Sequence, residues 1–455
     1  MSTSKTAAPY RGAKTWHLAL QSAAMFILFL VPQMPRQNVG FPFLLGALSL
    51  FFFLFVERDL RSSLKGHEER WLLAALFGFA GYLFLNSLWS QVPSVALGKA
   101  VFVLLMIILT LIVSRAFTLQ SREALESAAL FALIGAVIGS AITCIEFSTE
   151  HIIGRSLYSA FPLIRPGDKT ISVLVMENGR LVELPQSEFR KPHDNAVIEI
   201  ASAALNRIHS FRMLLLWPIL YLAINYVRPK LGAAFACFIA LAAAYTIFVG
   251  ESQTSQAALV LSAATFFVAR AWSGLMHWTL LSAWCVAVGL ALPLAVAPYQ
   301  AGLYESEWIA PSFRDRMIIW GFTGEKAINS PLFGIGIRST RVLGKEIKKT
   351  QERLPGHIVP RRLGLHSHNN FLQVWFELGA VGALFVLAIG IGLLQGIRRL
   401  LLSVRPYAYA TFVSACIVAA FGWGLWQTWL LSGYALAVMM VVFIDSYARR
   451  INPSG

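Results

Sequence analysis

The chain has 455 residues, of which 57% are hydrophobic and only 13% are charged, and its mean hydropathy is +0.63. This composition excludes an ordinary soluble globular protein and indicates an integral membrane protein. The formal net charge is +15. Much of this charge lies in short segments beside apolar stretches, where it is typical of a topology signal and not of nucleic-acid binding.

Apolar segments of roughly membrane-crossing length follow one another along the chain. We therefore expect an all-α integral membrane protein with about twelve transmembrane helices. Five helices are expected in residues 1–145, four in residues 211–298, and three in residues 369–455 together with a cytoplasmic tail. The expected spans are residues 16–31, 41–56, 71–89, 96–113, 124–145, 211–227, 231–249, 255–269, 278–296, 370–394, 407–423 and 426–444.

The distribution of basic residues predicts the orientation of these spans. Seventeen lysines and arginines fall in the segments on the N-terminal side of the membrane, against Arg36 alone in the four short loops on the other side. Positive charge is enriched in short cytoplasmic segments. Both termini are therefore expected in the cytoplasm, and two long loops, residues 146–210 and 299–368, are expected in the periplasm.

The first long loop contains a predicted β-hairpin. Its segment TISVLVMENGRLVEL alternates apolar and polar residues on both sides of Asn178-Gly179. An Asn-Gly pair between two such runs is a strong signal for a two-residue hairpin turn.

The second long loop is rich in positive charge. It holds eleven basic residues against six acids, an excess that opposes the orientation trend. Long loops are exempt from that trend, so the charge is either a solvated face or a docking surface for a polyanionic lipid. The basic residues are Arg314, Arg316, Lys326, Arg338, Arg341, Lys345, Lys348, Lys349, Arg353, Arg361 and Arg362.

Within this loop, the segment SFRDRMIIWGFTGEKAINSPLFGIG predicts a short helix followed by a glycine-rich turn. Arg316 and Trp320 are four residues apart, which puts them on one face of that helix. We expect Ile319 and Trp320 in the lipid interface, which would hold Arg316 at headgroup level. Arg316 then either binds an anionic group or only snorkels to the interface.

Two more arginines stand at the beginning of the sixth expected span. Arg207 lies just before this span and Arg212 lies at its start, in the segment ALNRIHSFRMLLLWP. The planar guanidinium group binds oxyanions in a bidentate manner and keeps its proton, so both residues suit a diphosphate ligand.

The segment LHSHNNFLQVWFELGAVG opens a long apolar helix with a polar cluster. His368 is expected at the first turn of this helix, where free backbone N–H groups and the helix dipole favour negative charge. At 100° per residue, Gly379 and Gly382 fall close to the direction of His368. We expect another helix to pack closely against this glycine stripe.

His366 and His368 also form a His-x-His pair, which an extended strand would place on one face as metal ligands. No third histidine, cysteine or carboxylate follows at ligand spacing, so we expect no metal site. Glu377, farther along the same helix, is expected to pair within the bundle.

The histidine segment carries a family resemblance. The ligase motif H-[NSQ]-x9-G-x-x-[GTY] is matched by His368 and Asn369, followed at the required spacing by Gly379 and Gly382. The chain thereby resembles the O-antigen ligase and polysaccharide polymerase superfamily, a group of bacterial inner-membrane glycosyltransferases.

Two arginine motifs extend the resemblance. The R-x3-L element of the family is matched from Arg212 to Leu216, and Arg207 is an equally placed candidate, so the choice stays open. The third element is an arginine shortly before Ile-Trp and a Pro-Leu-hydrophobic-Gly-x-Gly turn, which is matched by Arg316 and residues 331–336. By motif, the resemblance covers roughly residues 206–394.

The resemblance implies transfer of a glycan from an undecaprenyl-pyrophosphate-linked donor to lipid A-core or another glycan acceptor, without nucleotide sugar, metal or cofactor. It implies that His368 is the general base, and that Arg316 with Arg207 or Arg212 stabilises the departing pyrophosphate. Membrane lipid is the surrounding partner, and no nucleic acid is expected. Further substrate-binding candidates are His366, Asn369, Arg314, Trp320 and Arg341.

Two other functions remain open on sequence grounds. A polysaccharide polymerase differs from a ligase only in its acceptor, and the motif spacing does not separate the two. A solute transporter would need several ionisable residues in the middle of the membrane, where the spans offer little beyond Lys99 and Glu377.

Overall fold

The computed structural model describes residues 8–30, 37–56, 70–160, 170–177, 180–187, 189–190, 199–200, 202–226, 229–351 and 366–451. Most of these residues are helical. The elements before the first long loop are α1 (Ala8–Leu30), η1 (Gln37–Gly40), α2 (Phe41–Phe51), η2 (Phe52–Val56), α4 (Arg70–Asn86), η3 (Ser87–Trp89), α5 (Pro93–Leu119) and α6 (Arg122–Ser148).

The first long loop adds one helix and four strands, and long helices follow it. The loop contains α7 (Ile152–Ala160), β1 (Thr170–Glu177), β2 (Arg180–Ser187), β3 (Phe189–Arg190) and β4 (Glu199–Ile200). The later elements are α8 (Ser202–Tyr226), α9 (Pro229–Val249), α10 (Gln253–Ala271), α11 (Ser273–Gly289), α12 (Ala291–Gln300), η5 (Leu303–Glu305), α13 (Pro311–Ala327), α14 (Ser339–Gln351), α15 (Asn370–Arg399), α16 (Arg405–Phe421) and α17 (Thr428–Ile451).

The architecture is that of a multi-pass membrane protein. Among the described residues, eight helices are long and apolar enough to cross a membrane, and α11 with α12, bent by 63° at their junction, can form a ninth span. Each of the twelve expected spans falls on one of the observed helices or on a pair of consecutive ones. The all-α membrane fold is therefore confirmed, while the span count by length and composition is lower than twelve.

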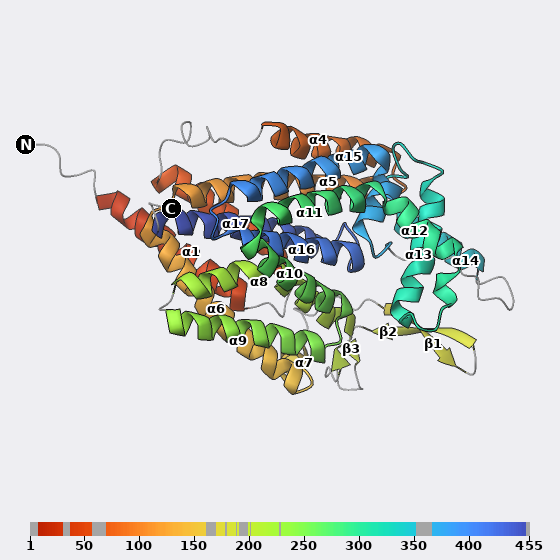
Figure 1. Ribbon diagram of the computed structural model, residues 1–455, viewed down its shortest axis with the longest axis horizontal. Coiled ribbons are helices and arrows are strands. Elements are labelled where there is room, and N and C mark those ends of the chain that lie inside the picture. Colours follow the sequence, from red (N-terminus) through yellow and green to blue (C-terminus); the bar gives the residue numbers. More distant parts are fainter. Residues whose placement is uncertain are drawn as a thin grey trace, which may run out of the picture.

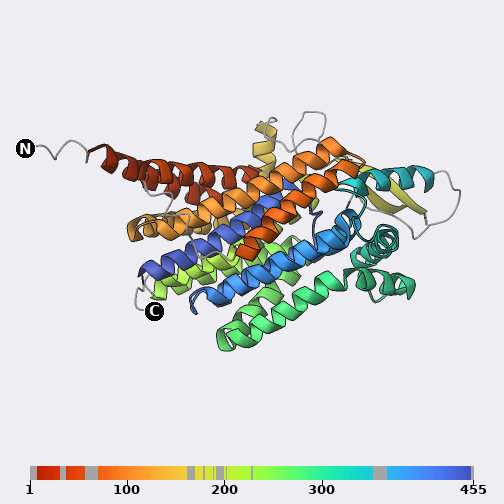
Figure 2. The same cartoon turned by 90° about the horizontal axis from the view of Figure 1, so that it is seen from above.

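The bundle has two distinct ends. The termini lie at one end, and α12, α13, α14 and the strands β1 and β2 lie at the other (Figure 1). A view turned by 90° shows the same separation, with α14 and the strand pair beyond the long helices (Figure 2). The two long loops thus share one end of the molecule.

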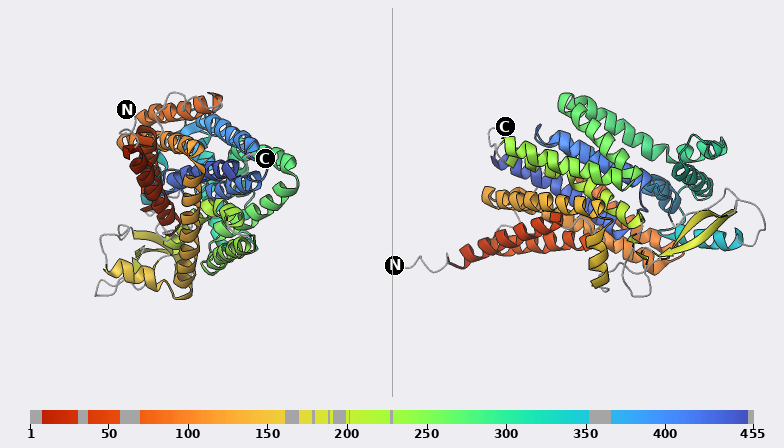
Figure 3. Two further views of the ribbon diagram at one scale, coloured as in Figure 1. Left: turned by 90° about the vertical axis from the view of Figure 1, so that its left-hand side faces the viewer. Right: turned by 90° about the horizontal axis from the view of Figure 1, so that it is seen from below.

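The predicted strand pair is present in the first long loop. β1 and β2 are antiparallel, with Thr170 opposite Ser187 and Glu177 opposite Arg180. The turn that we predict at residues 178–179 lies outside the described residues. The strands extend past the helical bundle when the molecule is seen from below (Figure 3).

Helix α8 runs through the centre of the bundle and is the most deeply enclosed of the candidate spans. It packs against α9, α16 and α17. Large apolar side chains on the outer helices, such as Leu241 and Phe267, are exposed as expected of surfaces that face lipid. Because α8 is central, the arginines near its N-terminal end are held inside the protein.

Helix α15 is broken at Gly379, and this break positions the site. Gly379 has φ 67° and ψ −166°, a backbone conformation that essentially only glycine adopts. The turn 331–336 fills the break, since the N–H of Ile335 donates to the carbonyl of Phe376 at 3.0 Å, and the N–H of Ala380 donates to that of Pro331 at 2.8 Å.

The expectation of a helix-packing stripe at Gly379 is therefore wrong. The neighbour that requires a glycine there is the backbone of Leu332 in the turn, and not a second helix. A pattern count at 100° per residue assumes an unbroken helix, which α15 is not.

Candidate active site

His368 lies just before α15, on a short and tightly bonded stretch of chain. Asn369 is the N-cap, and its side chain accepts a hydrogen bond of 3.1 Å from the N–H of Leu372. The Ser367 hydroxyl donates to the Asn369 carbonyl at 2.6 Å. His368 itself has φ 52°, an uncommon conformation for a residue other than glycine. The cap and the local bonds thus fix the direction of the histidine ring.

One ring nitrogen of His368 faces the segment 422–427 between α16 and α17. Its Nδ1 lies 3.1 Å from the carbonyl oxygen of Gly422. A carbonyl oxygen can only accept a hydrogen bond, so Nδ1 carries the proton of the neutral ring. The lone pair is then on Nε2, which is the arrangement that a general base requires.

Arg207 reaches the same segment from α8. Its guanidinium carbon lies 5.2 Å from the centre of the Trp423 ring, a cation–π contact. The Trp423 indole is itself held by a hydrogen bond of 3.1 Å to the hydroxyl of Ser210. Since Gly422 and Trp423 are neighbours in the chain, Arg207 and His368 contact adjacent residues of one short segment.

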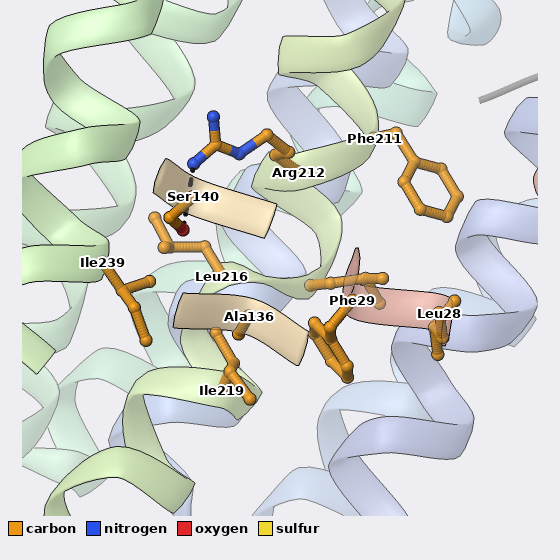
Figure 4. Close-up of a pocket in the computed structure, with 10 residues that line it drawn as sticks. Leu28, Phe29, Ala136, Ser140, Phe211, Arg212, Leu216, Ile219 and Ile239 are labelled. Carbon is orange, nitrogen blue, oxygen red and sulfur yellow. Dashed lines mark hydrogen bonds between the residues drawn. The ribbon is translucent and has the colours of Figure 1, made fainter. Parts of the chain in front are cut away.

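Arg212 takes a different direction. Its side chain donates to the hydroxyls of Thr246 at 3.0 Å and Ser140 at 3.5 Å, on α9 and α6. It lines, with Ser140, a small pocket whose other walls are apolar (Figure 4). No described contact links it to His368. Of the two arginines that the sequence leaves open, Arg207 is the one whose described contacts include the segment that His368 faces.

Helix α13 packs over the histidine segment. The Trp320 indole donates a hydrogen bond of 2.8 Å to the carbonyl of Ser367. Phe313 and Trp320 both contact the ring of Phe421, with ring centres 6.3 and 5.9 Å apart. Arg316 lies between these two aromatics on the same face of α13, because residues three and four apart share a helix face. It therefore lies on the face of α13 that meets Phe421.

The placement of Trp320 corrects one expectation. Ile319 and Trp320 are only 6% and 8% exposed, so they are buried in protein and do not lie in the lipid interface. Arg316 is half-buried, and burial lowers the pKa of its guanidinium while Asp315 acts in the opposite direction. On the same helix, the Nε of Arg314 is buried without a hydrogen-bond partner among the described residues.

His366 stands beside His368. The two ring centres are 4.0 Å apart and the rings meet edge to face. The ring packs on Gly424, where an added Cβ would come within 2.7 Å of the Cβ of His366. Burial lowers the pKa of His366 well below its usual value, and the charges of His368 and of two nearby arginines, Arg338 and Arg341, lower it further. His366 is therefore neutral at pH 7.

Glu377 ties these parts together from the middle of α15. It is fully buried, and its carboxylate accepts hydrogen bonds from the N–H of Arg338 at 3.0 Å and of Thr340 at 3.3 Å. The Trp426 indole donates a further hydrogen bond to it. The expectation that Glu377 pairs within the bundle is confirmed, with backbone amides and an indole as its partners.

Two parts of the site are missed by sequence reasoning. The segment 422–427 contacts both histidines, Arg207 and Glu377, yet it reads as a short link between two spans. Its composition, GWGLWQ, is the available signal, because two glycines and two tryptophans are unusual for a simple connection. Arg338 is the other, and it appears in the sequence only as one of eleven basic residues in a charged loop.

Comparison with known proteins gives a match that covers much of this site. Residues 236–387 match the family described as O-antigen ligase. This match contains α13, the turn 331–336, both histidines and the break in α15, and Arg207 and the segment 422–427 lie outside it.

Curated relatives also match the chain. A protein of Rickettsia typhi and one of Rickettsia prowazekii, each named "putative polysaccharide ligase", are 31% and 32% identical to it over 136 and 140 residues. These alignments cover 30% of this chain and 33% of each relative. The chain thus aligns with about one third of the length of these relatives. These relatives and the family match agree with the superfamily that the motifs indicate.

Proposed function

From the premise that the chain belongs to the O-antigen ligase superfamily, we propose that it transfers a polysaccharide from undecaprenyl pyrophosphate to lipid A-core. The transfer takes place at the periplasmic face of the bacterial inner membrane. The name that the Rickettsia relatives carry, polysaccharide ligase, supports a ligase over a polymerase. A solute transporter finds no support in the family match or in the names of the relatives.

The observation that carries this proposal is the pairing of a fixed histidine with a stacked arginine. His368 is held by Gly422 through Nδ1, and Arg207 lies on the adjacent Trp423. A base that accepts a proton and a cation that stabilises a departing anion are the two functions that glycan transfer from a pyrophosphate requires.

The chemical step follows from these positions. An acceptor hydroxyl gives its proton to Nε2 of His368 while its oxygen bonds to the anomeric carbon of the donor sugar. The bond from that carbon to the pyrophosphate oxygen breaks, and its electron pair leaves with the lipid pyrophosphate. The imidazolium then releases its proton to water, which restores the neutral ring.

The leaving pyrophosphate needs positive charge more than it needs a proton. Arg207 and Arg316 reach the surroundings of Gly422 from α8 and α13, and arginine binds oxyanions through paired N–H groups. We assign both to the pyrophosphate and leave Arg212 out of this role. Because two guanidinium groups supply the charge, the proposed step uses no metal. Because the donor is lipid-linked, it uses no nucleotide sugar.

The remaining candidates surround this centre. Asn369 and Trp320 hold the histidine segment in place, as the cap of α15 and as the indole that binds the carbonyl of Ser367. His366 packs against His368, Arg341 acts on His366, and both are proposed to contact substrate. Arg314 is proposed to do the same from α13, since its buried Nε has no described partner.

A deletion strain examined for its lipopolysaccharide tests the function. A ligase predicts that long O-chains accumulate on the lipid carrier and are absent from lipid A-core. Capping of the core by a single repeat would indicate a polymerase instead. Purified enzyme with lipid-linked donor and lipid A-core should form the product in the presence of a chelator, and loss of transfer on chelation would contradict the metal-free step.

A further inference from the structure

Two arginines that act on His366 have no stated ligand group in the step described above. Arg338 and Arg341 lie three residues apart at the N-terminal end of α14, and both are half-buried. Neither guanidinium makes an ion pair or a side-chain hydrogen bond with a described residue. Each is close enough to His366 to affect its protonation, and the two repel each other. Glu377 is the carboxylate that acts on Arg338, so two close cations stand beside one acid, and this excess of positive charge favours an anion.

The backbone around Arg338 is held in an uncommon conformation. Arg338 has φ 66°, and its N–H donates to the buried carboxylate of Glu377 at 3.0 Å. Both backbone polar groups of the preceding residue, Ile337, are hydrogen-bonded. Its N–H donates to the side-chain oxygen of Asn86 at 2.9 Å, and its carbonyl accepts from the hydroxyl of Ser90 at 2.6 Å. Strain of this kind persists only where the surroundings determine it, and it concentrates at functional sites.

His366, on which both arginines act and which contacts His368, offers a further polar group. The Nδ1 of His366 is buried and has no hydrogen-bond partner among the described residues. Its ring meets that of His368 at 4.0 Å, so a ligand held by Arg338 and Arg341 would stand next to the catalytic base. An unpaired buried nitrogen is costly, and a ligand that hydrogen-bonds it removes that cost.

We propose that Arg338, Arg341 and His366 form a second oxyanion site, which binds a phosphate group on the acceptor. This proposal rests on the proposed function. In a displacement at the anomeric carbon, the attacking hydroxyl and the leaving pyrophosphate stand on opposite sides of that carbon. Arg207 contacts Trp423, and Phe313 and Trp320 contact Phe421 from the face of α13 that carries Arg316, whereas His366 packs on Gly424. The pyrophosphate is thus already supplied with cations at residues 421–423, and the new site is assigned to the acceptor.

Binding of inorganic phosphate to the purified full-length protein tests the site without any need for transfer. In equilibrium dialysis with labelled phosphate, the double variant Arg338→Gln with Arg341→Gln should bind at least about tenfold more weakly, since it loses two charge-assisted contacts. Lys345→Gln is the matched control, because Lys345 is an exposed cation on the same helix. It should bind as the unchanged protein does. Equal binding by all three proteins would overturn the site.

A misfolded variant is recognised in two ways. Each protein should elute as a single species with an unchanged Tm. The milder change Arg338→Lys, which keeps the charge, should retain part of the phosphate binding. If Arg338→Lys and the double variant both bind phosphate normally while folded, the site is overturned.

Steady-state kinetics identify the substrate that carries the phosphate. The double variant should show at least about a tenfold higher KM for lipid A-core, with the KM for the lipid-linked donor unchanged, whereas Arg316→Gln should show the reverse. A higher KM for the donor alone in the double variant would overturn the assignment to the acceptor. If the unchanged protein transfers no glycan, the proposed function and the acceptor assignment both fall, and dialysis still decides whether the oxyanion site exists.

Discussion

The N–H of Ala380 donates a hydrogen bond of 2.8 Å to the carbonyl of Pro331, which joins the break in α15 to the turn between α13 and α14. The next pair repeats the contact, since the N–H of Val381 donates to Leu332 at 3.2 Å. Two separate sequence motifs, the Pro-Leu-Phe-Gly-Ile-Gly turn and the histidine motif that begins at His368, are therefore one structural unit. The unit sets the position of Glu377, and through it the position of Arg338.

Replacement of Gly379 by alanine should break this unit. Alanine at φ 67° and ψ −166° is strained by roughly 1–3 kcal/mol, and its Cβ would collide with the backbone of Leu332. We expect a lower Tm and a loss of transfer larger than the loss of folded protein. Gly396→Ala in the same helix is the control, because an added Cβ there meets no atom within 4 Å. Equal behaviour of the two variants would contradict the role of the break.

Replacement of His368 by alanine should abolish transfer while donor binding remains. Loss of a positioned general base costs on the order of 10²- to 10⁴-fold in rate. The measurement is transfer by purified variant at matched amounts, with donor binding followed separately. Near-normal transfer by the folded variant would remove His368 from the mechanism. His366→Ala should be milder, and an equal loss in both variants together with inhibition by a chelator would indicate a metal site.

The acid side of the pH profile should report a single histidine. The base acts only when its ring is neutral, so kcat/KM falls as the pH drops through the pKa of His368. The pKa of His366 is held well below its usual value by burial first and by neighbouring charges second, so this ring stays neutral over the same pH range. The logarithm of kcat/KM should therefore fall with a slope of one. A slope of two would mean that both rings must lose a proton before transfer.

The two arginines of α8 should respond differently to lysine. Arg207→Lys loses the planar stack on Trp423 and the paired N–H groups, so we expect transfer at least about tenfold slower although the charge is kept. Arg212→Lys should lower the stability of the protein, since Arg212 binds Thr246 and Ser140, and leave transfer per folded enzyme unchanged. The reverse outcome would restore Arg212 as the arginine that acts on pyrophosphate.

Local patterns predict the helices and strands well because those elements depend on nearby residues. The apolar runs locate every spanning helix, and the Asn-Gly pair locates the strands β1 and β2. The family motifs single out the turn 331–336, which the structure joins to α15, and His368, whose role as the base stays a prediction. These elements are encoded by spacing and by turn chemistry, which a sequence shows directly.

Contacts between distant parts of the chain are not visible in this way. Arg207 contacts Trp423, whereas Arg212 contacts Thr246. This difference depends on the helices that surround α8, which only the packed bundle reveals. Trp320 matches an interfacial tryptophan by composition, yet the fold places Ser367 and Phe421 against it. The break at Gly379 is hidden as well, because a count at 100° per residue cannot show that the turn 331–336 inserts into α15.

The orientation in the membrane is the last prediction. At the end of the bundle that carries the termini, Arg449 binds the carbonyl of Arg399 at 3.2 Å and Arg450 binds that of Thr118 at 3.4 Å. Basic residues thus gather at the end opposite to the candidate site, as expected for the cytoplasmic side.

Reporter fusions measure this directly. Fusions at Gly179 and Gly356, in the two long loops, should be exported, and a fusion in the turn between α15 and α16 should stay in the cytoplasm. Gly179 and Gly356 lie outside the described residues, but the elements next to them, β2 and α14, stand at the site end of the bundle. A cytoplasmic signal from either loop would put His368 on the wrong side of the membrane for a periplasmic acceptor, and the proposed reaction would then fail whatever the arginine variants showed.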